Sequence, residues 1–396
     1  MSALTQIKSY TLRTKLATGG FCDIWLAQHK GAMSQRRWCV LKLLKEEFRQ
    51  DEYSRKALTA EAILLARMAH PNIVHLLEFG EDASTEQLFC ALPYIQGKTL
   101  NHVVTRGTKS PYYGPAEALW IGIELLDALA YIHDLSDEQG KPLSIVHRDV
   151  SPENVLVTFD TGRIQLIDFG IALSELMTRQ TQLRRVKGKA QYLSPEQARG
   201  DRELDRRTDI YAVGLVLFYL FSGREAYPKD FMAALNMARN PKIPPLHKLV
   251  DLPHDIIHIV NSMLHVDPAH RPPAARKLAR HLSTLLQRYY PGYDRWSFAD
   301  QIRAILKHEI QDEHDFMASL HAGGTQIIAS DDLDEPNTRE LTEQTTPLVT
   351  SEDITPDSKT TSAGRTHATM PDIHASSSRQ KKTEQILGDL ENLYKK

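Results

Sequence analysis

The chain has 396 residues, of which 41% are hydrophobic and 25% are charged, and its formal net charge is −2 at pH 7. This is the composition of an ordinary globular protein and not of a fibrous or wholly disordered chain. A protein that coats nucleic acid or an anionic membrane needs a clear basic excess, so the near-neutral charge argues against both functions. As a loose prior, the length predicts two or three domains of about 100–200 residues each.

Cysteine usage and the apolar runs bear on the cellular compartment. Cys22, Cys39 and Cys90 form an odd, widely spaced set without the spacing of a zinc site, so neither a disulfide framework nor a structural metal is expected. The first residues lack the pattern of a signal peptide, and Ser2 stands where myristoylation requires glycine. The longest apolar run, Ile210 to Phe221, is well short of the ~20 residues that span a bilayer. We therefore expect a cytoplasmic protein with no membrane span.

The first ninety residues alternate strand-like runs with turn signals and contain one helical pattern, whereas the chain from Pro115 onward is mostly helical. This order predicts an α+β fold with two lobes, a small β-rich lobe followed by a larger helical one. The predicted strands are Tyr10–Leu16, Cys22–His29, Trp38–Leu44, Ile73–Phe79, Leu88–Leu92, Val155–Thr158 and Ile164–Leu166, and the main predicted helices are Tyr53–Met68, Pro115–His133, Arg207–Phe221 and Pro273–Leu286.

Beyond residue 323 the composition changes. Of the residues from 331 to 378, 16 are Ser or Thr, and ten acidic residues stand against three basic ones. Such a segment cannot bury enough apolar surface to offset its ordering entropy, so we expect 323–378 to be a disordered acidic tail. The last stretch, 379–396, regains helical spacing and predicts a short amphipathic helix, which docks either on a partner or on the rest of the chain.

A pair of glycines and a buried lysine suggest phosphate binding in the first lobe. Gly19 and Gly20 lie between two strand patterns, where the missing side chains let backbone N–H groups approach phosphate oxygens, although a plain hairpin turn has the same sequence. The next strand holds Lys42 among apolar neighbours, and a lysine inside a strand core needs a counter-charge. Glu61 lies on the line of Leu65 in the following helix and faces the sheet. The matched pair above a glycine turn favours a phosphate clamp.

The most informative segment runs from His147 to Asn154 and is followed, after two short strands, by Asp168. Asp149, the amide of Asn154 and the carboxylate of Asp168 provide three oxygen ligands or acceptors around one point. That set suits a base near a hydroxyl group and the oxygen ligands of Mg²⁺.

These residues carry a family resemblance. The motifs H-R-D-x-x-x-x-N and D-F-G, in this order behind a strand lysine, resemble the signature of the protein kinases. Ser194-Pro195-Glu196 stands where the family has A-P-E, Asp209 and Gly214 fit the D-x-x-x-x-G of the central helix, and Arg271 resembles the partner of Glu196. The run Ser194-Pro195-Glu196-Gln197-Ala198-Arg199-Gly200 most resembles the bacterial eukaryotic-like (Hanks-type) serine/threonine kinases.

The resemblance covers roughly residues 7–290 and implies a domain organisation. It implies a bilobal kinase domain with an N-lobe of about 7–92 and a C-lobe of about 96–290. A helical extension over 291–322, the tail and the terminal helix follow. It also implies Mg-ATP as the phosphate donor, with Mg²⁺ or Mn²⁺, and protein substrates. No nucleic-acid partner is expected, and phospho-binding modules are candidate readers of the tail's threonines.

Carried over position by position, the resemblance assigns roles to single residues. It implies that Lys42 holds the α- and β-phosphates and pairs with Glu61, that Asp149 accepts the substrate hydroxyl proton, and that Asn154 and Asp168 hold the metal. Leu92 resembles the gatekeeper behind the adenine, and Pro93 and Ile95 belong to the hinge. The nucleotide-binding residues implied in this way are Leu16, Gly19, Gly20, Ile24, Lys42, Glu61, Leu92, Pro93 and Ile95.

Four positions depart from the family pattern. Ala17 and Cys22 replace two loop glycines, and Cys22 is either a tolerated small residue or a redox-sensitive thiol. Ser151 replaces the lysine that Ser/Thr kinases use against the γ-phosphate, and Lys189 stands where the family usually has threonine. We hypothesise that these two changes compensate, so that Lys189 is a catalytic residue.

Two alternatives to a protein kinase remain open. The first is a catalytically weak pseudokinase scaffold that recruits partners through its tail, and the second is a small-molecule kinase, which the activation segment disfavours. In that segment Thr178 or Thr181 is the predicted autophosphorylation site, with Arg148 as the cradle for the phosphate. Ordinary loop hydroxyls in a constitutively competent enzyme are the alternative.

Overall fold

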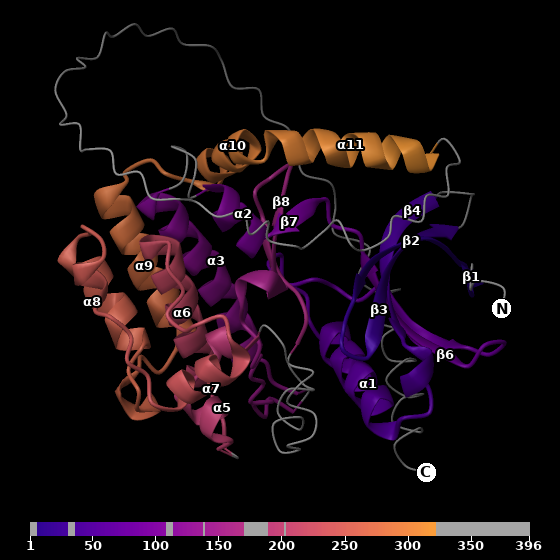
Figure 1. Ribbon diagram of the computed structural model, residues 1–396, viewed down its shortest axis with the longest axis horizontal. Helices are drawn as coiled ribbons and strands as arrows, with labels where there is room; N and C mark the ends of the chain where they lie inside the picture. The colour runs from indigo at the N-terminus through magenta and orange to yellow at the C-terminus, as the bar shows by residue number, and fades with distance from the viewer. Residues whose placement is uncertain are drawn as a thin grey trace, which may run out of the picture. The chain divides into compact units, whose positions relative to one another are not determined.

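A computed structural model describes residues 6–30, 36–107, 114–137, 139–169, 189–201 and 203–321. Its N-terminal strands form a six-stranded antiparallel sheet in the order β1-β2-β3-β4-β6-β5 (Figure 1). The strands are β1 (Gln6–Ile7), β2 (Tyr10–Thr18), β3 (Cys22–Lys30), β4 (Arg36–Leu44), β5 (Glu78–Asp82) and β6 (Gln87–Pro93). The first half of β2 alternates buried and more exposed side chains, whereas β6 is buried on both of its faces.

Helix α1 (Glu52–Ala66) packs on the face of this sheet that carries Lys42. It begins after Asp51, whose carboxylate accepts a hydrogen bond of 2.8 Å from the backbone N–H of Ser54, and such a cap satisfies one of the free donors of a helix start. Its buried Leu58 and Leu65 join the main hydrophobic core. The helix therefore presents Glu61 to the sheet, as its spacing predicts.

One predicted strand is wrong. The segment 73–79 was expected to pair in this sheet, but β5 begins only at Glu78. Ile73 instead forms an isolated bridge with Leu166, and the backbone N–H of Val74 donates to the carbonyl of Leu166 at 3.1 Å. Ile73 and Val74 are buried, whereas Leu77 is 46% exposed. The backbone near Ile73 pairs with a strand of the second sheet, a tertiary choice that local sequence does not encode.

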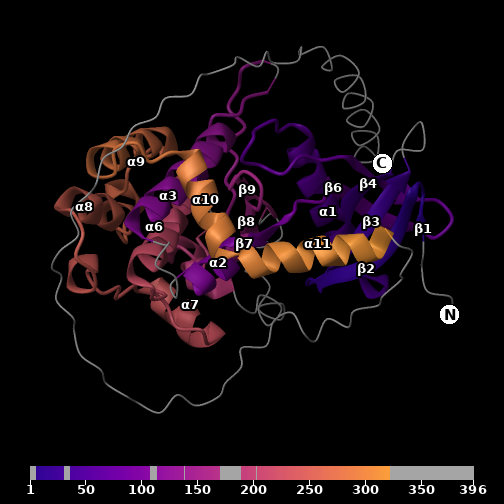
Figure 2. The same cartoon turned by 90° about the horizontal axis from the view of Figure 1, so that it is seen from above.

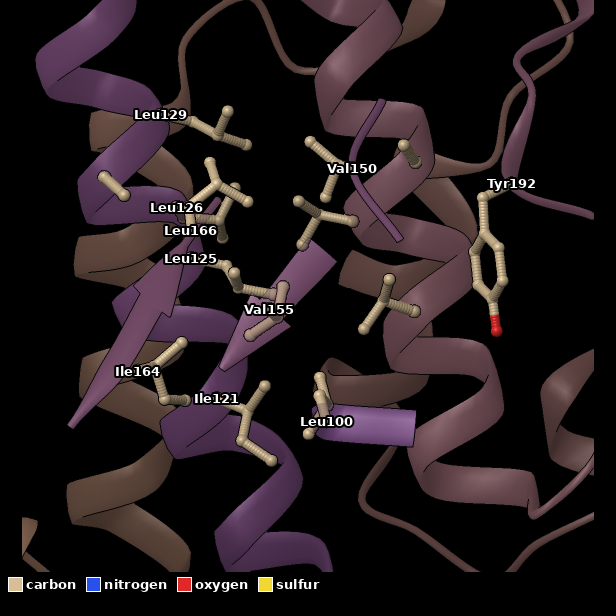
Figure 3. Packing of buried hydrophobic residues seen from close by; sticks show 14 of the residues in the cluster. Leu100, Ile121, Leu125, Leu126, Leu129, Val150, Val155, Ile164, Leu166 and Tyr192 are labelled. Carbon is tan, nitrogen blue, oxygen red and sulfur yellow. The ribbon is translucent and has the colours of Figure 1, made fainter. Parts of the chain in front are cut away.

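The C-terminal part is helical around a small three-stranded sheet in the order β7-β8-β9. Figure 3 shows Leu125 and Leu129 packing with Leu166 and Val155, so that the long helix α3 covers this sheet. The elements are β7 (Gly97–Thr99), α2 (Leu100–Gly107), α3 (Pro115–His133), β8 (Val155–Thr158), β9 (Ile164–Leu166), α5 (Pro195–Arg199), α6 (Arg207–Ser222), α7 (Phe231–Arg239), α8 (His254–Met263) and α9 (Ala275–Tyr289). The predicted α+β arrangement is confirmed.

Two further helices follow, α10 (Arg295–Ile305) and α11 (Lys307–His321). Phe298, Ile302 and Leu306 are fully buried and fix α10 to the helical part. Seen from above, α11 runs from α2 and β7 to the strands β2 and β4 (Figure 2). None of the helices described combines the length and the apolar character that a membrane crossing requires.

Candidate active site

Lys42 is the centre of a buried charge cluster. It is 8% exposed, and its Nζ lies 2.6 Å from Oε1 of Glu61 and also contacts Oδ1 of Asp168. Burial acts to lower the pKa of this ammonium group, but the carboxylates of Asp168 and Glu61 raise that pKa well above its ordinary value. Lys42 therefore remains charged at physiological pH, and the predicted pairing with Glu61 is formed.

The sheet register brings the expected nucleotide-binding side chains to one face. Ile24 of β3 lies directly opposite Lys42 of β4, and Leu92 of β6 lies opposite Val40, two residues before Lys42. Directly opposed residues project from the same face of an antiparallel pair, and so do residues two apart on one strand. Leu92 is buried there. Leu16 lies beside this set in β2, next to an irregularity in the β2–β3 register.

The glycine turn is a tight hairpin. The backbone N–H of Gly19 donates to the carbonyl of Cys22 at 2.8 Å, and a Cβ on Gly19 would lie 3.0 Å from that same oxygen. At Gly20 a Cβ would meet nothing within 4 Å, so the loop is open on that side. The turn therefore leaves its backbone exposed, as a phosphate-binding loop requires.

The thiol of Cys22 lies close to this charge cluster and is not activated. Desolvation by burial raises its pKa to about 12, and the positive charge of Lys42 only partly offsets the effect. Because the thiolate is the reactive form, this supports a tolerated small residue over a redox-sensitive thiol.

Asp209 of α6 holds the loop that carries Asp149. Its fully buried carboxylate accepts hydrogen bonds of 2.8 Å from the backbone N–H groups of His147 and Arg148, and Nε2 of His133 lies 2.8 Å from the same carboxylate. Burial opposes the charge, but these partners hold the pKa of Asp209 below its usual range. A charged anchor inside the core therefore fixes the backbone immediately before Asp149.

Asp149 and Asn154 are hydrogen-bonded to each other. Nδ2 of Asn154 donates to Oδ2 of Asp149 at 2.7 Å and to its backbone carbonyl at 2.8 Å. Since the amide nitrogen is used in this way, the amide oxygen of Asn154 is the atom left for a cation. The backbone N–H of Ile167 donates to the carbonyl of Asn154 at 2.9 Å, which ties the residue before Asp168 to the same loop.

The backbone is unusual at two of these residues. Arg148 has φ of 69° and Asp168 has φ of 55°, both in the left-handed region that L side chains seldom adopt. Phe169, next to Asp168, is buried with its ring centroid 4.6 Å from that of His147. Such conformations persist where the surroundings impose them, and they concentrate at functional sites.

An amide and a carboxylate at this spacing fit Mg²⁺, because that ion is held by one or two carboxylates together with waters and substrate phosphates. In the described part of the chain, no group of three or more His, Cys, Asp or Glu side chains is arranged as a metal site. Asn154 and Asp168 therefore offer the kind of oxygen ligands that Mg²⁺ accepts alongside waters and phosphates.

A second buried ion pair lies next to a residue that contacts the loop of Asp149. Nη1 and Nη2 of Arg271 donate to the two carboxylate oxygens of Glu196 at 2.7 and 2.8 Å, and both residues are buried. The neighbouring Gln197 donates from Nε2 to the backbone carbonyl of Arg148 at 2.8 Å. The predicted partnership of Glu196 and Arg271 is confirmed.

Some expected residues are not assembled here, and some contributors were missed. Lys189 begins a 3-10 turn (Lys189–Tyr192), but its side chain lies outside the described residues, as do Thr178, Thr181 and the segment after 321. The contacts that His133 and Gln197 make near this loop were not anticipated, because no spacing in the sequence indicates that these two side chains reach it. Only the tertiary fold brings them to the loop.

A comparison with family models matches the protein kinase domain over residues 10–282. Among curated relatives, the tyrosine-protein kinase MasK of Myxococcus xanthus is 32% identical over 77% of this chain and 46% of its own length. The serine/threonine-protein kinase PrkC of Bacillus subtilis is 29% identical over 69% of this chain and 40% of its own. The chain thus spans less than half of the length of these relatives.

Among solved structures, the kinase domain of PknI from Mycobacterium tuberculosis is 26% identical, with a TM-score of 0.53, over 72% of this chain and 99% of that domain. This likeness in fold adds to what this chain itself shows, namely the ion pair of Lys42, the loop of Asp149 and the buried carboxylate of Asp209. From the matched residues and the geometry of this site, the chain belongs to the protein kinase family, with bacterial kinases among its relatives.

Proposed function

We propose that the protein transfers the γ-phosphate of Mg-ATP to serine and threonine hydroxyls of proteins, including its own. The observation that carries this proposal is the contact of Lys42 with both Glu61 and Asp168. A scaffold has no physical need to keep a lysine charged in a buried position, because desolvating an ion costs several kcal/mol unless its partners offset it.

In this proposal each residue has one task. Lys42 binds the α- and β-phosphates while Glu61 orients it. Leu16, Ile24 and Leu92, which lie beside Lys42 in the sheet, enclose the adenine. Asn154 and Asp168 hold the divalent cation, which neutralises phosphate charge when bound. Asp149 accepts the proton of the attacking hydroxyl. The kinase lobes are assigned to about 7–92 and 96–290, followed by the extension over 291–322.

We further propose that Lys189 supplies the positively charged side chain that the catalytic loop lacks at Ser151. Ser151 is 1% exposed, and in the part of the chain that the structure describes its Oγ has no hydrogen-bond partner. An unpaired buried hydroxyl is costly and suggests a group that completes the site. In this proposal the ammonium group of Lys189 binds the γ-phosphate and the hydroxyl of Ser151 lies opposite it. Most Ser/Thr kinases have a lysine at the position of Ser151 and a threonine at that of Lys189.

The exchange is tested by substitution. Lys189→Ala is expected to cost far more turnover than Lys187→Ala, because only the former removes the γ-phosphate contact. Restoring the usual arrangement with Ser151→Lys and Lys189→Thr together is expected to recover turnover that Lys189→Thr alone loses. Equal activity of the two alanine variants would refute the exchange.

Regulation by phosphorylation is also proposed, at Thr178 or Thr181. Nε of Arg148 is buried and has no hydrogen-bond partner among the residues described, which suits a guanidinium that receives a phosphate. Phosphorylated threonines of the tail are proposed to recruit phospho-binding modules. A cytoplasmic location is proposed from the three free cysteines.

Tyrosine is the second candidate acceptor, because MasK is named a tyrosine-protein kinase. Phosphoamino-acid analysis after incubation with labelled ATP separates the two candidates. Wild type is expected to incorporate label on serine or threonine, whereas Asp149→Asn incorporates none and retains ADP binding. Label on tyrosine alone would move the assignment to the second candidate, and no label in either protein would favour the pseudokinase scaffold.

A further inference from the structure

Helix α11 lies beyond the residues matched by the kinase family model, which end at 282. Four of its buried residues follow one another at spacings of four, four and three, so they form a single stripe along the helix. At 1.5 Å per residue, the stripe is about 16 Å long. The stripe consists of Glu309, Glu313, Met317 and Leu320.

The first residue of the stripe contacts the helical part. Glu309 accepts from Nε of Arg106 at 2.7 Å, and its carboxylate lies 3.2 Å from Nε2 of His102. Both partners belong to α2. Burial opposes the charge of Glu309, but its hydrogen bonds and these two partners hold its pKa below the usual range, so the group is an anion at neutral pH.

The second residue contacts the segment between the two sheets. Tyr94 follows Pro93 at the end of β6, and its hydroxyl donates to Oε1 of Glu313 across 219 positions of sequence. The backbone N–H of Tyr94 also points to the carbonyl of Trp38 at 3.5 Å. Tyr94 therefore lies between two hinge residues of the proposed nucleotide site, Pro93 and Ile95, and its side chain is held by α11.

The last two residues of the stripe contact the N-terminal sheet. Met317 and Leu320 form a separate hydrophobic cluster with the fully buried Leu26 of β3. Leu16 and Trp38 pack against the same cluster. Leu26 is two residues after Ile24 and so projects from the same face as Ile24, which is the face proposed to enclose the adenine.

We infer that α11 is a brace across the hinge that completes the nucleotide site. Glu309 attaches it to α2, Glu313 fixes Tyr94, and Met317 fixes the sheet beside Leu16. These are positioning residues that hold both sides of the adenine pocket at one separation. Apparent affinity falls in proportion to the fraction of molecules in the competent arrangement, so a loosened brace weakens nucleotide binding without touching the nucleotide.

The test measures binding of Mg-ADP to the full chain by calorimetry. Tyr94→Phe and Glu313→Ala remove the two halves of the hinge contact, and each is expected to raise the Kd by about three- to tenfold, as a fall of the competent fraction to roughly 0.1–0.3 would do. The double variant should be no weaker than the worse single one, because both remove the same contact. Glu313→Gln keeps an acceptor oxygen and should bind nearly as wild type does.

Matched controls separate bracing from general damage. Asp312→Ala changes an exposed neighbour on the same helix and should bind Mg-ADP as wild type does. Thermal unfolding of every variant without nucleotide identifies those that fail to fold. A Kd within twofold of wild type for Tyr94→Phe and Glu313→Ala, both folded, would overturn the brace.

The brace rests on the proposed function only in that both use one nucleotide site. Failure of the two ideas is distinguishable, because the brace is measured by ADP binding alone and the transfer reaction by label incorporation. In an active enzyme, the same hinge variants should raise the KM for ATP while kcat stays within about twofold. A fall in kcat with an unchanged KM would contradict a positioning role.

Discussion

Replacing Asp209 by asparagine tests how the active-site loop is held. The change keeps the shape of the side chain but turns one acceptor oxygen into an NH₂ donor. Oδ1 accepts from the N–H of Arg148, and Oδ2 accepts from the N–H of His147. Whichever way the new amide is oriented, one of these backbone donors therefore faces another donor in a fully buried position.

The cost can be worked from these contacts. A hydrogen bond to a charged group contributes about 1.5–3 kcal/mol, and the bond that survives is weakened because its acceptor is neutral. We expect Asp209→Asn to lower the free energy of unfolding by about 3 kcal/mol. At about 2–4 °C per kcal/mol for a domain of this size, the midpoint Tm should fall by roughly 6–12 °C.

Thermal unfolding followed by circular dichroism measures this shift, with Asp201→Asn as the control because that aspartate is half exposed at the surface. Label incorporation at a temperature where both variants are folded should also be lower for Asp209→Asn, since the loop that carries Asp149 is displaced. A Tm for Asp209→Asn within about one degree of the control would refute the role of the buried carboxylate.

Three further predictions concern other parts of the fold. Arg271 holds the pKa of Glu196 below its usual range despite burial. The pair therefore stabilises the protein above the unfolded pKa of about 4.3, and this stability is lost as the pH falls. Between about pH 5 and about pH 3, the free energy of unfolding should decrease less for Glu196→Gln than for wild type. Gly162 has φ of 60°, and a Cβ there would lie 2.9 Å from the α10 backbone, so Gly162→Ala should lower the free energy of unfolding in urea by about 1–3 kcal/mol. Gly140→Ala is the control and should cost less, because φ there is 78° but no atom lies within 4 Å of the added Cβ. Equal costs for the two variants would contradict the close approach at Gly162. With a pKa of about 12, Cys22 should resist iodoacetamide at pH 8 in the folded protein, and rapid modification detected by mass spectrometry would contradict its protonated state.

Much of the site could be predicted because its chemistry is local in sequence. A lysine in an apolar strand needs a counter-charge, and this requirement together with the helical spacing of Glu61 and Leu65 pointed to Glu61, which the structure pairs with Lys42. The loop from His147 to Asn154 is a short motif whose internal hydrogen bonds follow from its spacing. The most regular elements, such as the helix Pro115–His133, were predicted with their observed ends.

What could not be predicted depends on contacts between distant residues. The chain over 291–322 was expected to be helical, but nothing in it indicated that Glu313 would meet Tyr94. The stripe of α11 contains two acids, so it does not stand out as an apolar face in the sequence. Likewise, the apolar residues near Ile73 resemble a strand, and only the bridge to Leu166 shows where their backbone is satisfied.

The position of α11 also bears on where the folding unit ends. A recombinant fragment cut at residue 290, near the end of the family match, would lack the side chains that cover Leu26 and Trp38. It would expose apolar surface beside the hinge, and contiguous exposed apolar surface promotes aggregation. The stable unit for expression, crystallisation or inhibitor screening should therefore include residues up to His321, and nucleotide affinities measured on a shorter fragment would describe a different molecule.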